Sequence, residues 1–245
     1  MSPDKTFEFA IGRFRFRPTW RRTIFVVPAI VILFGLGTWQ VERLQWKLGL
    51  IHDRETRSTA PAMAPPASAE DIAEIEFRKV ALAGRFLNDR EMYLAARSLR
   101  GNLGYHVVTP FIGGDGEVTL VDRGWVPLDR KEPKSREAGE IEGTTTIEGL
   151  IRKQGRPGWF VPDNQPGKNF WFFVDIPAMA GHAGLAKVRP YFVEAGPGAN
   201  PGGLPIGGQS QIELPNNHLS YAITWYSLCL ALLIIFLIYH RVKPE

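Results

Sequence analysis

Two stretches without charged residues decide the fold: TIFVVPAIVILFGLGTW at positions 23–39 and YAITWYSLCLALLIIFLIY at positions 221–239. At 1.5 Å of rise per residue, helices of these lengths measure about 25–28 Å, close to the roughly 30 Å hydrocarbon core of a bilayer. A buried helix of a soluble core can also be apolar on all sides, but these two runs are each bounded by arginine and aromatic residues. The sequence therefore predicts two transmembrane helices, one near each end of the chain.

The first apolar run is predicted to be an uncleaved anchor. Arg21 and Arg22 precede it, as basic residues precede a signal peptide, but the run passes directly into Thr38, Trp39 and Gln40 without a small-residue cleavage pattern. The arginine pair also resembles a twin-arginine signal, although a charge cluster beside a membrane helix explains it better.

Basic residues flank both predicted helices on the side toward the ends of the chain. They are Lys5, Arg13, Arg15, Arg17, Arg21 and Arg22 before the first helix, and Arg241 and Lys243 after the second. Short basic flanks stay in the cytoplasm, whereas long loops are translocated largely regardless of charge. We therefore expect both termini in the cytoplasm, or in the matrix of a mitochondrion, and the intervening domain outside. The missing Ser/Arg-rich presequence favours the bacterial inner membrane with a periplasmic domain, and the mitochondrial inner membrane is less expected.

The net charge of +4 for 245 residues comes substantially from these basic tails. It therefore gives no support to nucleic-acid binding, and membrane lipid is the expected environment of the helices. We predict a basic cytoplasmic tail over residues 1–22, a transmembrane helix over 23–41, a helical extension and Pro/Ala-rich linker over 42–70, an exported domain over 71–214, a second transmembrane helix over 215–240 and a cytoplasmic tail over 241–245.

The exported domain is predicted to be rich in β-structure. Short segments with β-branched and aromatic residues alternate with Gly-rich turns, and the Gly-Gly-Asp-Gly turn at positions 113–116 indicates a hairpin. The expected strands are 77–86, 92–97, 105–111, 118–126, 144–152, 170–174 and 189–195, with a short helix over 177–185 and long loops over 129–143 and 196–208. The fold class is thus membrane α plus a soluble α+β or mainly β domain, with two antiparallel transmembrane helices flanking a small antiparallel sheet or partly closed barrel.

Residues typical of catalysis are scarce in the exported domain. The single cysteine, Cys229, lies in the second apolar run, so this domain can form neither a disulfide nor a CxxC site. It contains no GxSxG, Walker or HExxH motif. His106 and His182 are each interpreted as structural, and Asp122 with Arg123 as strand-end residues that form a local ion pair or hydrogen bond. The sequence therefore predicts a protein that is not an enzyme.

Unusual residues concentrate where the two helices meet the outer face of the membrane. Trp39, Arg43 and Trp46 share one side of a helix, and so do His218, Tyr221 and Trp225; Gln40 lies beside the first group. An interfacial aromatic belt explains the tryptophans and Tyr226. It does not explain His218, Arg43 and Gln40 together with the rigid Pro-Asn-Asn start of the second helix. A histidine is a natural axial ligand of haem iron, and arginine and aromatic rings suit the rest of the macrocycle.

The same residues carry a resemblance to a known family. The segments LGTWQVER at 36–43 with Trp46-Lys47, GYHVVTPF at 104–111, VDRGWVP at 121–127 and PNNHLSYAITWY at 215–226 resemble the signature blocks of the Surfeit locus protein 1 family, the cytochrome c oxidase assembly factors. The resemblance covers the chain from the first helix to the last, and the block at the second helix is the most specific. The two-helix topology with one exported domain is also that of the family.

The resemblance implies a non-enzymatic assembly factor, or chaperone of respiratory-chain biogenesis, that assists insertion of haem a into oxidase subunit I. Haem a synthase and other oxidase assembly factors are further partners that it implies. In some members the histidine that matches His218 is the proposed haem a ligand. Gly124 falls in the family's RGWVP block, where a side chain would disturb a tight turn. The sequence departs from the family at Asp163-Asn164-Gln165-Pro166, where Asn-Asp-Pro is commoner, and at Cys229.

Two functions of other classes remain open at the level of sequence. A copper-delivery factor for the same oxidase would use thiolate or Met-rich sites, and the exported domain offers only the widely spaced Met63, Met92 and Met179. A membrane-anchored periplasmic hydrolase would need a nucleophile, a base and an orienting group that converge in one pocket. Such a triad can be built from residues far apart in sequence.

Overall fold

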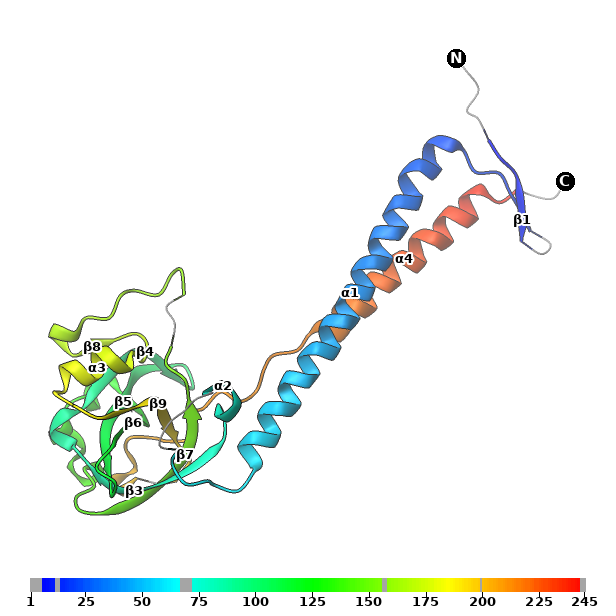
Figure 1. Cartoon of the computed structure of the whole chain (residues 1–245). Helices are drawn as coiled ribbons and strands as arrows, with labels where there is room; N and C mark the ends of the chain where they lie inside the picture. Colours follow the sequence, from blue (N-terminus) through cyan, green and yellow to red (C-terminus); the bar gives the residue numbers. More distant parts are fainter. Residues whose placement is uncertain (1–5, 12–13, 67–71, 156–157, 199, 243–245) are drawn as a thin grey trace. The chain divides into compact units, whose positions relative to one another are not determined.

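The computed structural model describes residues 6–11, 14–66, 72–155, 158–198 and 200–242 (Figure 1). The chain divides into two compact units. Residues 1–52 and 213–245 form one, which we call the helix unit, and residues 53–212 form the other, which we call the β domain.

The first predicted transmembrane helix and its predicted extension are one continuous helix, α1 (Trp20–Thr59). Helix-forming residues continue beyond the apolar run, and the helix stops just before Ala60, whose successor Pro61 disfavours the helical conformation. The second is α4 (His218–His240). Both are long and apolar enough to cross a membrane, and only 11% of the most apolar window of each is buried. These helices therefore do not belong to a soluble core, and the chain is a membrane protein.

The two helices run antiparallel, as the order of their contacts shows. Arg22 lies over the ring of Tyr239, 4.4 Å from its centroid, near the ends of the chain. Further along α1, the hydroxyl of Thr38 lies 3.2 Å from that of Tyr226. Gly37 is buried at this contact, and a Cβ atom there would lie 2.6 Å from the Tyr226 ring. A glycine thus lets the tyrosine approach the backbone of α1 closely.

The basic tail contains a small hairpin that was not expected from the sequence, formed by β1 (Phe9–Ile11) and β2 (Phe14–Phe16). Its end meets the C-terminal end of α4. The Arg17 backbone N–H donates to the His240 carbonyl at 2.8 Å, and the Val242 N–H donates to the Arg15 carbonyl at 2.8 Å. The two basic flanks therefore lie at the same end of the helix pair, in agreement with the expectation that both termini face the same compartment.

The β domain contains a seven-stranded sheet with the order β3-β7-β9-β6-β5-β4-β8. A further pairing between β3 and β5 closes five of these strands into a ring, so the sheet is barrel-like. At the closure Gly84 lies so near the partner strand that a Cβ atom would be 2.1 Å from the Ile112 carbonyl oxygen. The strands are β3 (Lys79–Phe86), β4 (Met92–Leu99), β5 (Asn102–Gly113), β6 (Val118–Pro127), β7 (Thr145–Arg152), β8 (Phe170–Trp171) and β9 (Val188–Ala195).

The predicted β-rich architecture is confirmed, and of the two predicted forms the partly closed barrel is the one observed, although its sheet is mixed and not wholly antiparallel. β6 pairs with β9 in parallel, and β4 pairs with β8 in parallel. The chain reaches β9 through α3 (Ile176–His182), and such a connection allows parallel pairing. The predicted strand 170–174 is only two residues long because the Asn164 side chain accepts the backbone N–H groups of Phe172 and Phe173, at 2.8 and 3.3 Å.

Two apolar clusters make up most of the core. One fills the ring and includes Val80, Phe111 and Tyr191. The other packs α3 and the segment before it against the sheet and includes Leu94, Trp171 and Met179. The remaining short elements are α2 (Ile72–Ile75) and the 3-10 turns η1 (Asn88–Arg90), η2 (Leu128–Arg130), η3 (Pro133–Gly139), η4 (Pro166–Lys168) and η5 (Pro201–Gly203), so the loops predicted over 129–143 and 196–208 contain short turns of helix.

Candidate functional site

His218 opens α4 and its side chain contacts α1. Its Nδ1 lies 2.7 Å from Oε1 of Gln40, and its backbone N–H lies 3.4 Å from the Asn216 side-chain oxygen. Asn217 is the residue that caps the helix, but its side chain forms no capping hydrogen bond. The Pro-Asn-Asn start thus places the histidine ring against the neighbouring helix, with one direct polar partner.

The Gln40 contact fixes which nitrogen of His218 carries the proton. An amide oxygen can only accept a hydrogen bond, so Nδ1 donates. In the neutral imidazole Nε2 then bears the lone pair. No hydrogen bond to Nε2 occurs among the residues that the structure describes. The ring is therefore oriented by one partner and keeps a free lone pair, which is also the arrangement of histidines that bind metals.

Gln40 is turned into the helix pair and its neighbour Trp39 is turned out of it. Gln40 is 8% exposed, whereas Trp39 is 53% exposed. Burial of an amide requires a hydrogen-bond partner, and His218 supplies it. The two residues therefore stabilise each other at the junction of α1 and α4.

The other predicted site residues surround this junction without bonding to the histidine. Arg43 stacks on Trp46, with its guanidinium carbon 3.8 Å from the ring centroid. Tyr221 is exposed and Trp225 is partly buried. Within the described chain, none of Arg43, Tyr221 and Trp225 forms a hydrogen bond or ion pair with His218. The structure thus brings Gln40 directly to His218 and leaves the aromatic side chains and Arg43 at the periphery.

The helices share a second polar contact, which was not predicted from the sequence. Thr38 and Tyr226 bond to each other through their hydroxyls, next to the buried Gly37. A sequence signal for this contact exists, because Gly37 and Thr38 are adjacent small residues in an apolar run, and small residues mark helix contacts in membranes.

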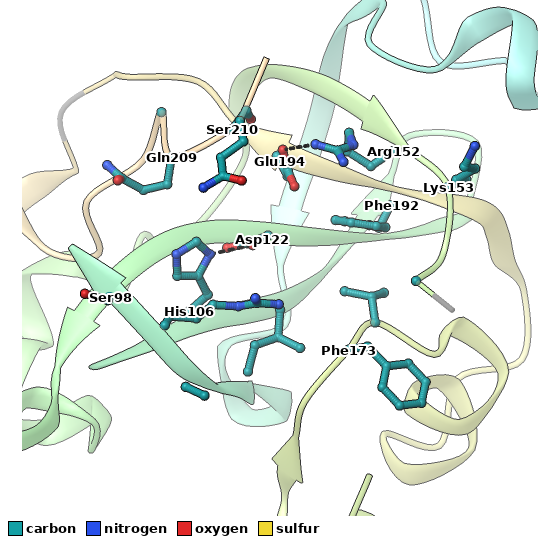
Figure 2. Close-up of a pocket in the computed structure, with 17 residues that line it drawn as sticks. Ser98, His106, Asp122, Arg152, Lys153, Phe173, Phe192, Glu194, Gln209 and Ser210 are labelled. Atoms are coloured by element: carbon teal, nitrogen blue, oxygen red, sulfur yellow. Dashed lines mark hydrogen bonds and ion pairs between the residues drawn. The ribbon is translucent and has the colours of Figure 1, made fainter. Parts of the chain in front are cut away.

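His106, interpreted from sequence as structural, is paired with Asp122. Its Nδ1 lies 2.8 Å from Oδ2 of the carboxylate, and the two side chains are 15% and 7% exposed. The pair lines a cavity of about 740 Å³ in the β domain (Figure 2). His182 instead packs edge-on against Trp171, with ring centroids 5.7 Å apart.

Asp122 and Arg123 lie within β6 and not at the end of a strand, and each side chain forms a hydrogen bond or ion pair, as expected, but with different partners. A register shift between β5 and β6 places Arg123 as an extra residue, which faces away from Asp122. Its guanidinium lies 3.5 Å from Glu91 and over the ring of Phe86. Asp122 meanwhile accepts the Gly124 N–H at 3.0 Å and the His106 ring N–H.

Gly124, in the same strand, has φ +116°. A Cβ atom added there would lie 2.0 Å from the Ile206 carbonyl oxygen. This approach lets Trp125 and Ile206 exchange two backbone hydrogen bonds, at 2.8 and 2.9 Å. Only glycine fits such a conformation and contact without displacement of the backbone.

A buried ion network holds the strand that carries Asp122. Glu91 pairs with both Arg123 and Arg136, and all three are buried. Burial lowers the pKa of Arg123. Burial alone would also lower the pKa of Arg136, but the hydrogen bond and charge of Glu91 raise it. Glu91 therefore stabilises the charge of Arg136 more strongly than that of Arg123.

Comparison with known proteins identifies the relatives of this chain. The model of the SURF1 family matches residues 27–230. A SURF1-like protein of Monosiga brevicollis is 40% identical over 210 residues, which cover 81% of this chain and 79% of that protein. Surfeit locus protein 1 of Mus musculus is 38% identical over 223 residues, covering 85% of this chain and 71% of the relative. That of Homo sapiens is 39% identical over 217 residues, covering 82% and 71%.

Proposed function

Because this chain belongs to the SURF1 family, and this membership implies an assembly factor for cytochrome c oxidase, we propose that it assists the insertion of haem a into subunit I. We further propose that His218 is the ligand of the haem iron. The protein then acts by holding and presenting a cofactor and catalyses no reaction of its own. Subunit I is the proposed direct partner, and haem a synthase and other assembly factors are proposed neighbours.

One observation carries this proposal: the His218 Nδ1 to Gln40 Oε1 hydrogen bond of 2.7 Å. It leaves the lone pair of Nε2 for iron and orients the ring from a buried amide. Haem iron is held by a histidine in many proteins. The amide carries no net charge, so the partner of the histidine adds none beside the ring at the membrane face, where an isolated charge is costly.

The remaining residues of the junction fit the other parts of haem. Arg43 has its guanidinium stacked on Trp46, and a guanidinium suits a carboxylate such as a propionate. Trp39 and Tyr221 present exposed rings at the same junction, and flat aromatic surfaces suit a macrocycle. When bound, haem a would supply only its own redox chemistry, and these residues would position it and shield it from water.

The two helices make the chain a membrane protein, and we propose that the β domain lies on the side opposite the basic tails. The relatives described above include animal proteins, which favours a mitochondrial inner membrane. The location in a bacterial inner membrane, which the sequence favoured, stays a prediction. In a bacterium the β domain would face the periplasm, and in a mitochondrion it would face the side opposite the matrix.

Neither alternative function gains support from the structure. Among the residues it describes, no three or more of His, Cys, Asp and Glu gather where they could hold a metal ion, and the single cysteine of the chain, Cys229, lies in α4. The His106–Asp122 pair resembles two members of a hydrolytic triad, but no serine hydroxyl in the described chain hydrogen-bonds to this histidine. A triad needs that third contact.

The proposal is tested by His218→Ala in full-length protein purified from cells that make haem a. We expect the visible haem spectrum to disappear, because iron loses its ligand, while membrane insertion and thermal unfolding of the β domain stay unchanged. His52→Ala, at an exposed position on α1, is the matched control and should keep the full spectrum.

Arg43→Ala is a second test variant, for which a partial effect is expected. It should lower haem content without abolishing it, because a contact to a propionate adds affinity but does not hold the iron. Full haem content and an unchanged spectrum in His218→Ala would refute the ligand role, and His218 would then serve only to bond Gln40 and begin the helix.

A further inference from the structure

We propose that the β domain has a binding site of its own, for a small amphipathic carboxylate, with Arg97 as the anchor of the carboxylate and His106 as a second polar contact. The site is the 740 Å³ cavity between β4, β5, β7, β9 and the segment around Gln209 (Figure 2). Pockets for small molecules commonly measure about 300–1,000 Å³. This inference does not depend on haem binding at His218.

Arg97 is the cation of the cavity wall that has no partner in the described chain. Its Nε is buried and forms no hydrogen bond. The other cations are neutralised: Arg152 bonds Glu194 at 2.9 Å, and Lys153 bonds Glu76 at 2.9 Å. A buried donor without an acceptor loses its hydration and gains nothing in exchange. An anion bound in the cavity would supply the missing acceptor in a charge-assisted hydrogen bond.

A strained bulge places Arg97 on this wall. The pairing of β4 with β5 shifts between Leu94, opposite His106, and Arg97, opposite Gly104. Side chains alternate across a sheet, so residue 97 would face away from residue 94 in a regular strand. The bulge turns Arg97 to the same face as Leu94 and His106. It does so at a cost, because Ala96 has φ +55°, which is unfavourable for a residue other than glycine.

The register of the neighbouring strands brings the polar groups together. Asp122 lies opposite Val108, two residues from His106 and hence on its face, and Glu194 lies beside Asp122 on β9. Since a carboxylate can only accept, Asp122 holds the proton on His106 Nδ1. The other ring nitrogen, Nε2, is therefore left to accept a hydrogen bond from a hydroxyl or N–H of the ligand.

Apolar side chains complete the wall and define the body of the ligand. Leu94, Phe173, Val174 and Phe192 line the same cavity. Figure 2 shows Phe173 on one side of it, while the hydrogen-bonded pairs His106–Asp122 and Arg152–Glu194 lie on the others. A ligand with an aromatic or aliphatic body, one carboxylate and one hydrogen-bond donor matches the apolar wall, the Arg97 cation and the His106 acceptor.

The test uses full-length protein in detergent and 3-(4-hydroxyphenyl)propionate as the probe, with binding followed by ligand-observed NMR. We expect binding by the wild type, and weaker binding by about 10- to 100-fold in Arg97→Gln, the usual effect of losing a charge-assisted contact. Arg85→Gln, at an exposed position on β3, is the matched control and should bind as the wild type does. The amide of the probe, which lacks the charge, should bind the wild type as weakly as the acid binds Arg97→Gln.

Thermal unfolding separates a binding role from a structural one. Because Arg97 has no partner to lose, Arg97→Gln should unfold at the same temperature as the wild type or higher. A clear fall in that temperature, equal binding of acid and amide, or undiminished binding by Arg97→Gln would each overturn the proposal. The haem spectrum of Arg97→Gln should equal that of the wild type, so failure here leaves the proposal for His218 untouched.

Discussion

The helix unit and the β domain each present a histidine held in the same way but in opposite surroundings. In the helix unit, His218 Nδ1 donates to a neutral amide at 2.7 Å, beside exposed aromatic rings. In the β domain, His106 Nδ1 donates to a carboxylate at 2.8 Å, inside a cavity whose walls carry charged and apolar side chains. In both pairs the Nε2 atom of the histidine is left to interact with a bound ligand.

The two histidines differ in the group that accepts the hydrogen bond from Nδ1. Gln40 orients its histidine and adds no charge, which suits a neutral ring that donates electrons to a metal at a membrane surface. Asp122 places a full negative charge beside its histidine, within a wall that also contains Arg97, Arg152 and Lys153. The first arrangement is suited to a metal complex and the second to a polar organic molecule. The same local hydrogen bond therefore supports different chemistry in the two units.

The largest effect is expected from Gly124→Glu, which should unfold the β domain and leave the helix unit intact. A side chain at φ +116° and 2.0 Å from a backbone oxygen must displace the backbone, at a cost above about 4 kcal/mol. The β domain should lose its thermal transition and become sensitive to protease, and oxidase assembly should fall. Haem content should persist, because no residue of the His218 junction is changed.

Gly114→Ala is the matched control, since Gly114 has open space around its Cα and no positive φ. It should unfold within about 0.5 kcal/mol of the wild type. Wild-type stability and normal oxidase levels in Gly124→Glu would contradict the steric argument. Loss of haem from this variant would show that the two sites are not independent.

An intermediate effect is expected from Gln40→Leu, which removes the partner of the His218 ring. The proposed iron ligand stays, but its orientation and tautomer are no longer fixed. Such outer contacts usually contribute about 10- to 100-fold in metal affinity. Haem titration of the purified protein should show a loss in this range, and Gln45→Leu, on an exposed face of the same helix, should show none. Equal affinities in the two variants would mean that the amide has no role in ligand binding.

The smallest effect is expected from Tyr226→Phe, which removes the hydroxyl that bonds Thr38 between the helices. Hydrogen bonds between membrane helices contribute about 0.6 kcal/mol on average, and Thr38 keeps a bond to the Phe34 carbonyl. Thermal unfolding of the helix unit should therefore shift slightly and haem binding should not change. Tyr239→Phe keeps its ring under Arg22 and serves as the control. A large loss of haem in Tyr226→Phe would place this hydroxyl in the site.

The sequence alone was sufficient for the features that depend on local composition. Apolar length predicted α1 and α4, the PNNHLSYAITWY block predicted the family and pointed to His218, and alternating β-branched residues predicted most strands. Each of these signals lies within one continuous stretch, so it can be read without knowledge of the partner segment.

The tertiary structure decided everything that depends on pairing between distant segments. His106 meets Asp122 because β5 pairs with β6 in one register, and Arg97 joins them only because a bulge shifts β4 by one residue. A shift of one residue moves a side chain to the other face of a sheet, and no pattern within β4 alone specifies it. His218 was evident from its motif, but its bond to Gln40, 178 residues away, depends on how two helices pack. The sequence therefore determined which residues are present at each site, and the register of strands and helices decided which of them meet.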